Sequence, residues 1–204
     1  MLLLAPRQRF TLNSVCYLSL LAELFISTQT AAMVKTYYAE FFTATILNWQ
    51  KLLQDDFFKQ LIVDSLQWLV KEKRCTVYSF VIMPNHMHLI WRIAMGLERE
   101  IAQGALLSFI VHAFKRHLKQ NPSLLKNFYV DAGDRDYQFW QREPMVKEVW
   151  TERFLLQKLN YIHYNPCQPQ WKLVTIPEDY KWSSVMFYEK NIIEPYTWLT
   201  HYKN

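Results

Sequence analysis

Residues 76–93 read TVYSFVIMPNHMHLIWRI, two apolar runs separated by the short segment Met83-Pro84-Asn85. Both runs are rich in β-branched and aromatic residues, which favour strands, and Pro-Asn is a frequent turn dipeptide. The segment therefore predicts a buried strand pair joined by a tight turn, and we expect this pair to form the centre of the fold.

The second run carries two histidines, His86 and His88. Side chains alternate along a strand with period two, so both imidazoles are expected on the same face of the sheet. Imidazole is a common metal ligand, and a rigid strand holds two such ligands at little entropic cost. An isolated histidine is more often a structural residue, so a metal site predicted from this pair needs support from elsewhere in the chain.

The composition narrows the class of protein. The length of 204 residues suits one domain with a full core, and 51% hydrophobic with 16% aromatic residues argues against disorder. Only three glycines occur, which leaves no glycine-rich phosphate loop and argues against a nucleotide cofactor. The net charge of +5 favours an anionic partner such as nucleic acid. The three cysteines lack CxxC spacing, which argues against a disulfide framework and against a structural zinc site. So few cysteines favour a reducing, cytoplasmic location.

The first 32 residues differ from the rest. Two arginines precede a short apolar run over residues 15–22, a pattern that a secretory signal peptide also shows. Glu23 interrupts the run, which is too short to span a membrane. The alternatives are a disordered arm and an over-extended translation start, with Met33 as the true first residue. We therefore predict an N-terminal extension (residues 1–32), a single domain (residues 33–204) and no association with a membrane.

From Met33 onward, strand and helix patterns alternate without a dividing linker. The order strand–helix–strand–strand–helix–strand favours an α+β fold with a ferredoxin-like antiparallel sheet and helices packed on one face. The predicted elements are a strand over residues 37–47, a helix from Asp55 or Asp56 to about Lys73, the strand pair above, a helix over residues 97–120, a short strand over residues 137–142, and a helix from about Thr151 to Asn165-Pro166.

The same periodicity predicts which residues form the core. Two tryptophans, Trp68 and Trp91, are assigned to it. Each long helix adds an apolar stripe: Phe58, Ile62, Leu66 and Leu69 in the first, and Ile101, Leu106, Phe109, Ile110 and Ala113 in the second.

The second informative segment is residues 157–166, QKLNYIHYNP, at the end of the last predicted helix. At about 100° per residue, Lys158, Tyr161 and Asn165 share one polar stripe with Gln157. Tyr161 and Asn165 are i,i+4 neighbours, so both can face one point in front of the sheet. A hydroxyl nucleophile, an amide oxygen for a metal and a cation for a phosphate would then lie together.

A tyrosine nucleophile needs help at neutral pH. The phenol has an ordinary pKa of about 10, so ionising it at pH 7 costs roughly 4 kcal/mol. A divalent metal that polarises the phosphate oxygens lowers this burden, because it makes the phosphorus more electrophilic. Two histidines and one amide leave coordination positions open for a substrate, and such a set of nitrogen and oxygen ligands suits Mg²⁺ or Mn²⁺.

Two motifs, MPNHMH at residues 83–88 and YIHYNP at residues 161–166, together resemble a known family. They are similar to the single-tyrosine transposases of the HUH superfamily, and most of all to the REP-associated, insertion-sequence-like branch. His-x-His alone is a weak signal, whereas both motifs in this order are a strong one. The resemblance extends over residues 33–188 and includes the stretches at residues 42–47, 137–141 and 180–184.

The resemblance implies a role for several residues. His86 and His88 would hold a divalent metal, Mg²⁺ or Mn²⁺, with Asn165 as the third ligand. Tyr161 would attack a phosphodiester of single-stranded DNA at a hairpin or palindromic repeat, giving a 5′-phosphotyrosine and a free 3′-hydroxyl that can later reverse the step. The family also implies a homodimer.

Lys158, Arg142 and Trp140 are the candidate DNA contacts. Lys158 and Arg142 offer positive charge to phosphates, and Trp140 is the candidate for stacking on an unpaired base. The chain departs from the family's pattern at residues 142–145 and at residues 167–171. We therefore expect the DNA contacts and the geometry behind the last helix to differ from those of relatives.

Rival interpretations come from other classes. A non-cleaving nucleic-acid-binding protein would keep the same fold and bind DNA without using a metal. A metal hydrolase with His-x-His ligands would resemble amidohydrolase barrels, which need about 250 residues or more, and the chain lacks the spacing for their further ligands. Tyr164 and Tyr180 are alternative nucleophiles, but only Tyr161 has an asparagine at i+4.

Overall fold

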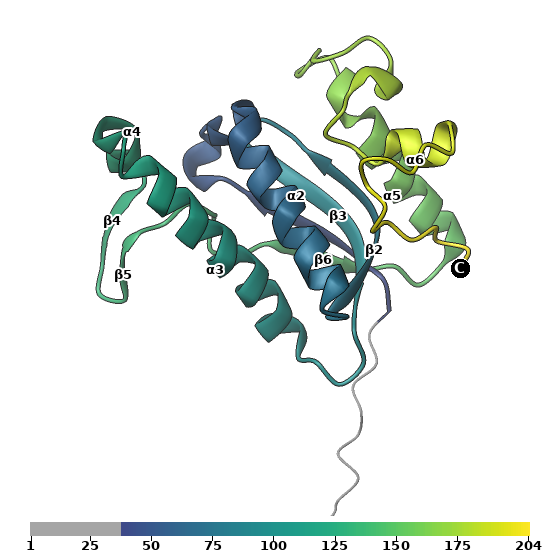
Figure 1. The fold of residues 1–204 in the computed structure, drawn as a ribbon, viewed down its shortest axis with the longest axis horizontal. Helices are drawn as coiled ribbons and strands as arrows, with labels where there is room; N and C mark the ends of the chain where they lie inside the picture. Colours follow the sequence, from purple (N-terminus) through teal and green to yellow (C-terminus); the bar gives the residue numbers. More distant parts are fainter. Residues whose placement is uncertain (1–37) are drawn as a thin grey trace, which may run out of the picture. The chain divides into compact units, whose positions relative to one another are not determined.

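The computed structural model describes residues 38–204, and its framework is a four-stranded antiparallel sheet (Figure 1). Along the chain the main elements follow as β1-α2-β2-β3-α3-β6, and in the sheet the strands lie in the order β2-β3-β1-β6. This connectivity is ferredoxin-like, so the predicted α+β class is confirmed. The predicted extension, residues 1–32, lies outside the described residues. The strands are β1 (Glu40–Thr45), β2 (Cys75–Ile82), β3 (His86–Ile93) and β6 (Met145–Glu148).

The two histidines lie at the start of β3, directly after the hairpin turn. Met83 N–H donates to His86 C=O at 2.8 Å, which closes the turn at the predicted place. β1 runs beside β3 with Thr43 opposite His88 and Thr45 opposite His86. Because directly opposed residues of paired strands share a sheet face, both threonines and both histidines lie on one face.

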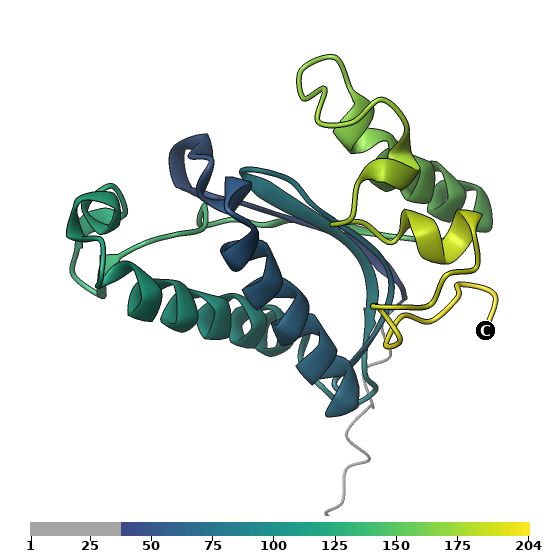
Figure 2. The same cartoon turned by 45° about the horizontal axis from the view of Figure 1, so that its top comes forward.

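Helices α2 (Asp56–Lys71) and α3 (Arg99–Leu118) pack against one face of the sheet (Figure 2). The side chain of Asp55 caps α2 by accepting from Phe57 N–H at 2.9 Å, as its place before the apolar stripe predicts. The predicted stripe of α2 is buried, and Trp91 of β3 is fully buried as well. These residues form the main core between sheet and helices.

The core-facing side of α3 differs from the predicted stripe. Leu106 and Ile110 are buried, but Ile101 is 68% and Phe109 54% exposed, so their assignment to the core was wrong. The residues that face the sheet recur every four positions, and Ile101 and Phe109 fall outside that row. Trp68, also assigned to the core, is 41% exposed and stacks on Phe109 with ring centroids 6.1 Å apart.

An insertion separates α3 from β6. The strand predicted over residues 137–142 is wrong in extent, because only its first residue belongs to a strand of the insertion. The chain then runs past the end of β1, where Gln141 N–H donates to Thr45 C=O at 2.8 Å. The fourth strand of the main sheet, β6, was not predicted, because its sequence MVKE is short and half polar. The insertion holds α4 (Pro122–Lys126), β4 (Tyr129–Ala132) and β5 (Arg135–Tyr137).

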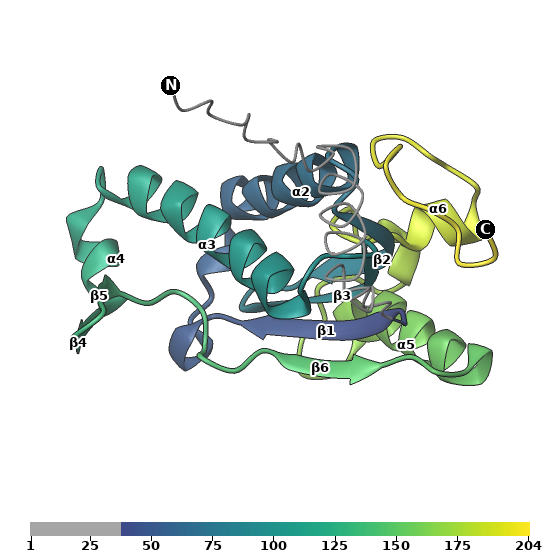
Figure 3. The same cartoon turned by 90° about the horizontal axis from the view of Figure 1, so that it is seen from below.

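Helix α5 (Glu152–Tyr164) packs against the other face of the sheet, opposite α2 and α3 (Figures 2 and 3). Thr151 caps it, with its hydroxyl accepting from Phe154 N–H at 3.2 Å. Leu159 and Ile162 are buried on the side of α5 that contacts β2 and β3. Helices therefore lie on both faces of the sheet and not on one face as predicted, and α5 covers the face that carries the histidines.

The C-terminal segment lies along the outer edge of β2. Trp182 C=O accepts from Ile82 N–H at 2.9 Å, and Val77 C=O accepts from Thr200 N–H at 3.0 Å. Within residues 38–204, no helix combines the length and apolar character needed to cross a membrane. The remaining short helices are η1 (Leu47–Trp49), η2 (Leu52–Gln54), η3 (Asn165–Cys167), η4 (Pro177–Asp179) and α6 (Val185–Glu189).

Candidate active site

β3 brings His86 and His88 together, with ring centroids 4.6 Å apart. His88 is 3% exposed, and its Nδ1 lies 2.7 Å from the hydroxyl of Thr43. His86 Nδ1 lies 2.6 Å from Asn85 Oδ1, an atom that only accepts, so Nδ1 donates and Nε2 keeps its lone pair. Both rings are therefore oriented through Nδ1, as is usual for histidines that bind a metal through Nε2.

Burial keeps both imidazoles neutral. It lowers the pKa of His86 from its ordinary value of 6.5 to about 4. Burial also lowers the pKa of His88 well below 6.5, and the neighbouring charges of His86 and Lys158 add to this effect. Both rings are therefore uncharged at pH 7, which is the form that binds a metal.

Helix α5 brings Tyr161 against the face that carries the histidines. Its ring centroid lies 5.1 Å from that of His88 and 6.0 Å from that of Phe41 on β1. Tyr161 is 43% exposed, so a ligand can reach it from solvent. Tyr180, one of the alternative nucleophiles, is buried instead and donates to Ile82 C=O at 2.7 Å.

Two buried polar atoms of the predicted site, His88 Nε2 and Asn165 Oδ1, have no hydrogen-bond partner among residues 38–204. Asn165 follows the last residue of α5 and is 2% exposed. A buried polar atom without a partner costs about 1–3 kcal/mol, so two of them require an explanation. The other such side-chain atoms in the described part of the chain are indole N–H donors, those of Trp91, Trp140 and Trp198.

The chemistry of this donor set fits a divalent cation. The described residues contain no cluster of three or more His, Cys, Asp or Glu that could hold a metal. For a cation bound by His86 and His88, the unpaired amide oxygen of Asn165 would be a suitable third protein ligand. Three protein ligands leave open positions, which is typical of catalytic and not of structural metal sites.

Lys158 supplies a cation one helical turn before Tyr161. Its Nζ lies 4.6 Å from the ring centroid of Phe41 and 5.5 Å from that of Tyr161. Burial lowers the pKa of Lys158 from its ordinary value of 10.5, and the charge of Lys147 adds to this. The structure therefore brings Lys158, Tyr161 and the histidine pair to one place, as the helical stripe predicted.

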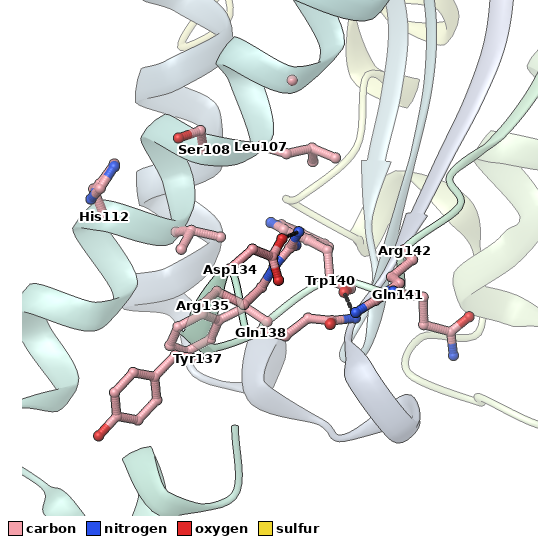
Figure 4. Close-up of a pocket in the computed structure, with 13 residues that line it drawn as sticks. Leu107, Ser108, His112, Asp134, Arg135, Tyr137, Gln138, Trp140, Gln141 and Arg142 are labelled. Atoms are coloured by element: carbon pink, nitrogen blue, oxygen red, sulfur yellow. Dashed lines mark hydrogen bonds and ion pairs between the residues drawn. The ribbon is translucent and has the colours of Figure 1, made fainter. Parts of the chain in front are cut away.

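The other two predicted DNA contacts, Trp140 and Arg142, lie in the segment between β5 and β6. Trp140 is 5% exposed and packs on Phe114 of α3, with ring centroids 6.1 Å apart, on the sheet face opposite α5. Trp140 and Arg142 line a cavity of about 480 Å³ between α3 and residues 134–142 (Figure 4). Their contact with DNA stays a prediction, because no interaction with Tyr161 or the histidines links them to the site.

Three residues beside the histidines were missed by the sequence reasoning. Thr43 and Asn85 contact the two Nδ1 atoms, and the ring centroid of Trp171 lies 5.5 Å from that of His86. The position of Asn85 directly before His86 was an available signal. Thr43 and Trp171 come to the site only through strand register and through the turn after α5, so no local pattern identified them.

Comparisons with known proteins show a likeness in fold. No protein-family model matches the chain, and no curated protein matches its sequence. The fold is similar to a solved structure of a REP-associated tyrosine transposase bound to a REP hairpin, with a TM-score of 0.55 and 19% sequence identity. The match covers 74% of this chain and 78% of the other. At this identity the likeness shows the fold alone.

Proposed function

We propose that this chain is a metal-dependent transposase that nicks and rejoins single-stranded DNA at hairpin ends through a 5′-phosphotyrosine intermediate. The observation that carries the proposal is the pair of buried polar atoms without partners, His88 Nε2 and Asn165 Oδ1, together with a solvent-accessible Tyr161 that contacts His88. The ferredoxin-like fold and its likeness to a tyrosine transposase support the same reaction class.

In this proposal Nε2 of His86, Nε2 of His88 and Oδ1 of Asn165 hold Mg²⁺ or Mn²⁺. When bound, the ion polarises the oxygens of the scissile phosphate and makes the phosphorus more electrophilic. Asn85 and Thr43 hold the two rings in place, so the ligands are preorganised before the ion arrives.

Tyr161 acts as the nucleophile. Its phenolic oxygen forms a bond to phosphorus, and the bond from phosphorus to the 3′-oxygen breaks. The phenol gives its proton to solvent, and the leaving 3′-oxygen takes a proton from solvent. The product is a 5′-phosphotyrosine and a free 3′-hydroxyl. Since one phosphodiester replaces another, the reverse attack by a 3′-hydroxyl rejoins DNA without an external energy source.

Lys158 stabilises the negative charge on the phosphate in this step. Its ammonium group lies over the ring of Tyr161 with Nζ 5.5 Å from the centroid, where it attracts the negatively charged phosphate. The net charge of +5 suits a DNA substrate. We also propose Arg142, for its charge, and Trp140, for its aromatic ring, as DNA contacts outside the reacting centre. The resemblance of the two motifs supports a homodimer as the assembly.

The test is adduct formation. The protein is incubated with Mg²⁺ or Mn²⁺ and with single-stranded hairpin oligonucleotides taken from the DNA around its own coding region. We expect a covalent protein–DNA adduct on a denaturing gel, lost in Tyr161→Phe and in the presence of EDTA. Tyr164→Phe is the matched control, because Tyr164 lies on the same helix and is 55% exposed; it should form the adduct normally.

The rival function, a DNA-binding protein that does not cut, gives a different result in the same assay. Wild-type protein would then bind the hairpins with EDTA present and would give no cleavage product. Tyr161→Phe would bind them equally well. No adduct across all palindromic repeats near the gene, despite tight binding, would favour this rival over the transposase.

A further inference from the structure

Trp171 lies beside His86 and has no part in the steps above. The two ring centroids are 5.5 Å apart and the rings are inclined at 47°. The indole packs on the core along one side but is only half-buried, so part of its surface is open to solvent. A flat aromatic surface next to a phosphate-binding site is suited to stacking on a nucleobase.

A hydrogen-bonded turn fixes Trp171 to the end of α5. Gln168 N–H donates to Asn165 C=O at 3.1 Å, and Trp171 N–H donates in turn to Gln168 C=O at 2.8 Å. Leu173 N–H donates to Pro166 C=O at 3.0 Å and closes the turn. Because the turn begins at Asn165, the backbone of Trp171 is held in a fixed position relative to the end of α5.

The residue after Trp171 is held in a strained conformation. Lys172 has φ of 46°, in the left-handed region that favours glycine. Such strain persists only where surrounding contacts determine the backbone, and it is found at ligand-binding sites. The exposed ammonium of Lys172 follows the indole directly in sequence, and a cation next to an aromatic ring is the usual combination for binding single-stranded nucleic acid.

The ring contacts give the direction in which DNA crosses the site. Trp171 contacts His86, His86 contacts His88, and His88 contacts Tyr161. The indole thus lies beside His86 and the phenol beside His88, one ring at each histidine of the pair. In phosphoryl transfer the attacking and leaving oxygens lie roughly in line. A phosphate at the histidine pair that is attacked by Tyr161 therefore has its leaving 3′-oxygen on the side of Trp171.

We propose, building on the function above, that Trp171 stacks on the base of the nucleotide that carries the leaving 3′-oxygen. After the nick, the 5′-phosphate is bonded to Tyr161, whereas the strand with the 3′-hydroxyl is held only by non-covalent contacts. Stacking on Trp171 keeps that hydroxyl beside the phosphotyrosine, so that the reverse attack can rejoin the strand. Trp171 is in this sense a positioning residue for rejoining.

A binding assay tests the stacking without any need for cleavage. The probes are hairpin oligonucleotides with one abasic nucleotide placed in turn at each position around the nick that wild-type protein makes. In the Tyr161→Phe background, we expect the abasic nucleotide directly 5′ of the nick to weaken binding roughly 5- to 100-fold. Adding Trp171→Ala should remove this penalty, and Trp171→Phe should keep most of it, as measured by fluorescence anisotropy.

Trp150→Ala is the matched control, because Trp150 is 63% exposed and packs on Tyr38 with ring centroids 4.3 Å apart. It should leave every abasic penalty unchanged. A second readout uses active Tyr161: in Trp171→Ala, the ratio of released 3′-hydroxyl strand to rejoined DNA should rise about tenfold or more, while adduct formation at saturating DNA changes less.

Two results would overturn the role of Trp171. One is a loss of affinity from the abasic nucleotide 5′ of the nick that is the same with Trp171 and with Ala at this position. The other is a loss of affinity that depends on Trp171 but arises from an abasic nucleotide 3′ of the nick. If wild-type protein still forms the adduct in these cases, the proposed transposase function stands and only the stacking is wrong. A wild-type protein that neither binds nor cuts any hairpin overturns both proposals.

Discussion

The two faces of the β1–β3 strand pair carry two buried polar clusters that are built in opposite ways. On the face toward α3, the carboxylate of Glu40 is fully buried and accepts from Arg99 Nε at 2.9 Å and Gln103 Nε2 at 3.0 Å, and Arg99 also pairs with Glu148. On the face toward α5, His88 Nε2 and Asn165 Oδ1 accept nothing from the described residues.

The difference separates a cluster that stabilises the fold from one that is prepared for a ligand. In the first cluster, removal of one member leaves a buried charge without its partner. In the second, the unpaired polar atoms already destabilise the fold by about 1–3 kcal/mol each, a free energy that a bound cation would offset. We therefore expect substitutions on the α3 face to change stability, and substitutions on the α5 face to change activity and metal binding.

The largest effect is expected from His88→Ala. Loss of this ligand should reduce adduct formation at least about a thousandfold, because the ion supplies several kcal/mol of charge stabilisation. The thermal midpoint should change little. Binding of Mn²⁺ by titration calorimetry and adduct formation on the same preparation check the two halves of the prediction. Unchanged Mn²⁺ affinity would remove His88 from the ligand set.

Arg99→Met should have the largest effect on stability. It leaves Glu40 buried without its cation, which costs about 3–5 kcal/mol, as measured by urea unfolding. Adduct formation per folded molecule should be retained at low temperature. Arg135→Met is the control, because Arg135 pairs with Asp134 in an exposed ion pair, and its stability should equal that of the wild type. Equal stability of both variants would contradict the comparison.

Lowering the pH should change the free energy of unfolding in opposite directions through His86 on one face and Glu40 on the other. With the folded pKa of His86 lowered to about 4 from 6.5, the unfolded chain binds the proton first, so stability falls as the pH drops from 6.5 towards 4. The loss is on the order of 3 kcal/mol for this histidine. Burial raises the pKa of Glu40 from 4.5, so its contribution is lost as the pH rises above 4.5.

The measurement is urea unfolding at several pH values between 4.5 and 7. His86→Gln should flatten the fall in stability on the acid side, and Glu40→Gln should steepen it. An acid dependence that is identical in wild type and His86→Gln would show that this imidazole is not held neutral by the fold.

The smallest effect is expected from Thr43→Val. This change keeps the shape of the side chain but removes the hydroxyl that lies 2.7 Å from His88 Nδ1. Metal affinity should fall about ten- to a hundredfold, as for other partners that orient a ligand. Thr45→Val, on the same face and opposite His86, should change Mn²⁺ affinity much less. Equal losses in both variants would argue against a specific orienting role.

The fold could be predicted where the pattern is local and strong. Apolar runs, capping residues and a turn dipeptide predict the β2–β3 hairpin and helices α2 and α5. The edge strand β6 is four residues long and half polar, so nothing in its own sequence marks it as part of the sheet. The assignment of Ile101 to the core failed because helical periodicity alone does not say which of two neighbouring stripes faces the sheet.

The same distinction holds for the candidate site. His86 with His88 and Tyr161 with Asn165 are neighbours by the period of a strand and of a helix, so their spacing was sufficient to pair them. Thr43 meets His88 across 45 residues of sequence, through a register that no local pattern contains. Trp171 depends on a turn whose shape is set by hydrogen bonds back to the end of α5.

The central claim, that Tyr161 forms a metal-dependent covalent bond to DNA, is tested most directly by mapping the adduct. Wild-type protein is incubated with Mn²⁺ and a hairpin oligonucleotide, digested, and analysed by mass spectrometry. The account predicts a nucleotide 5′-phosphate on Tyr161, absent with EDTA and in His88→Ala. A phosphotyrosine at another position, an adduct that forms equally well in EDTA, or no adduct on a bound hairpin would contradict it.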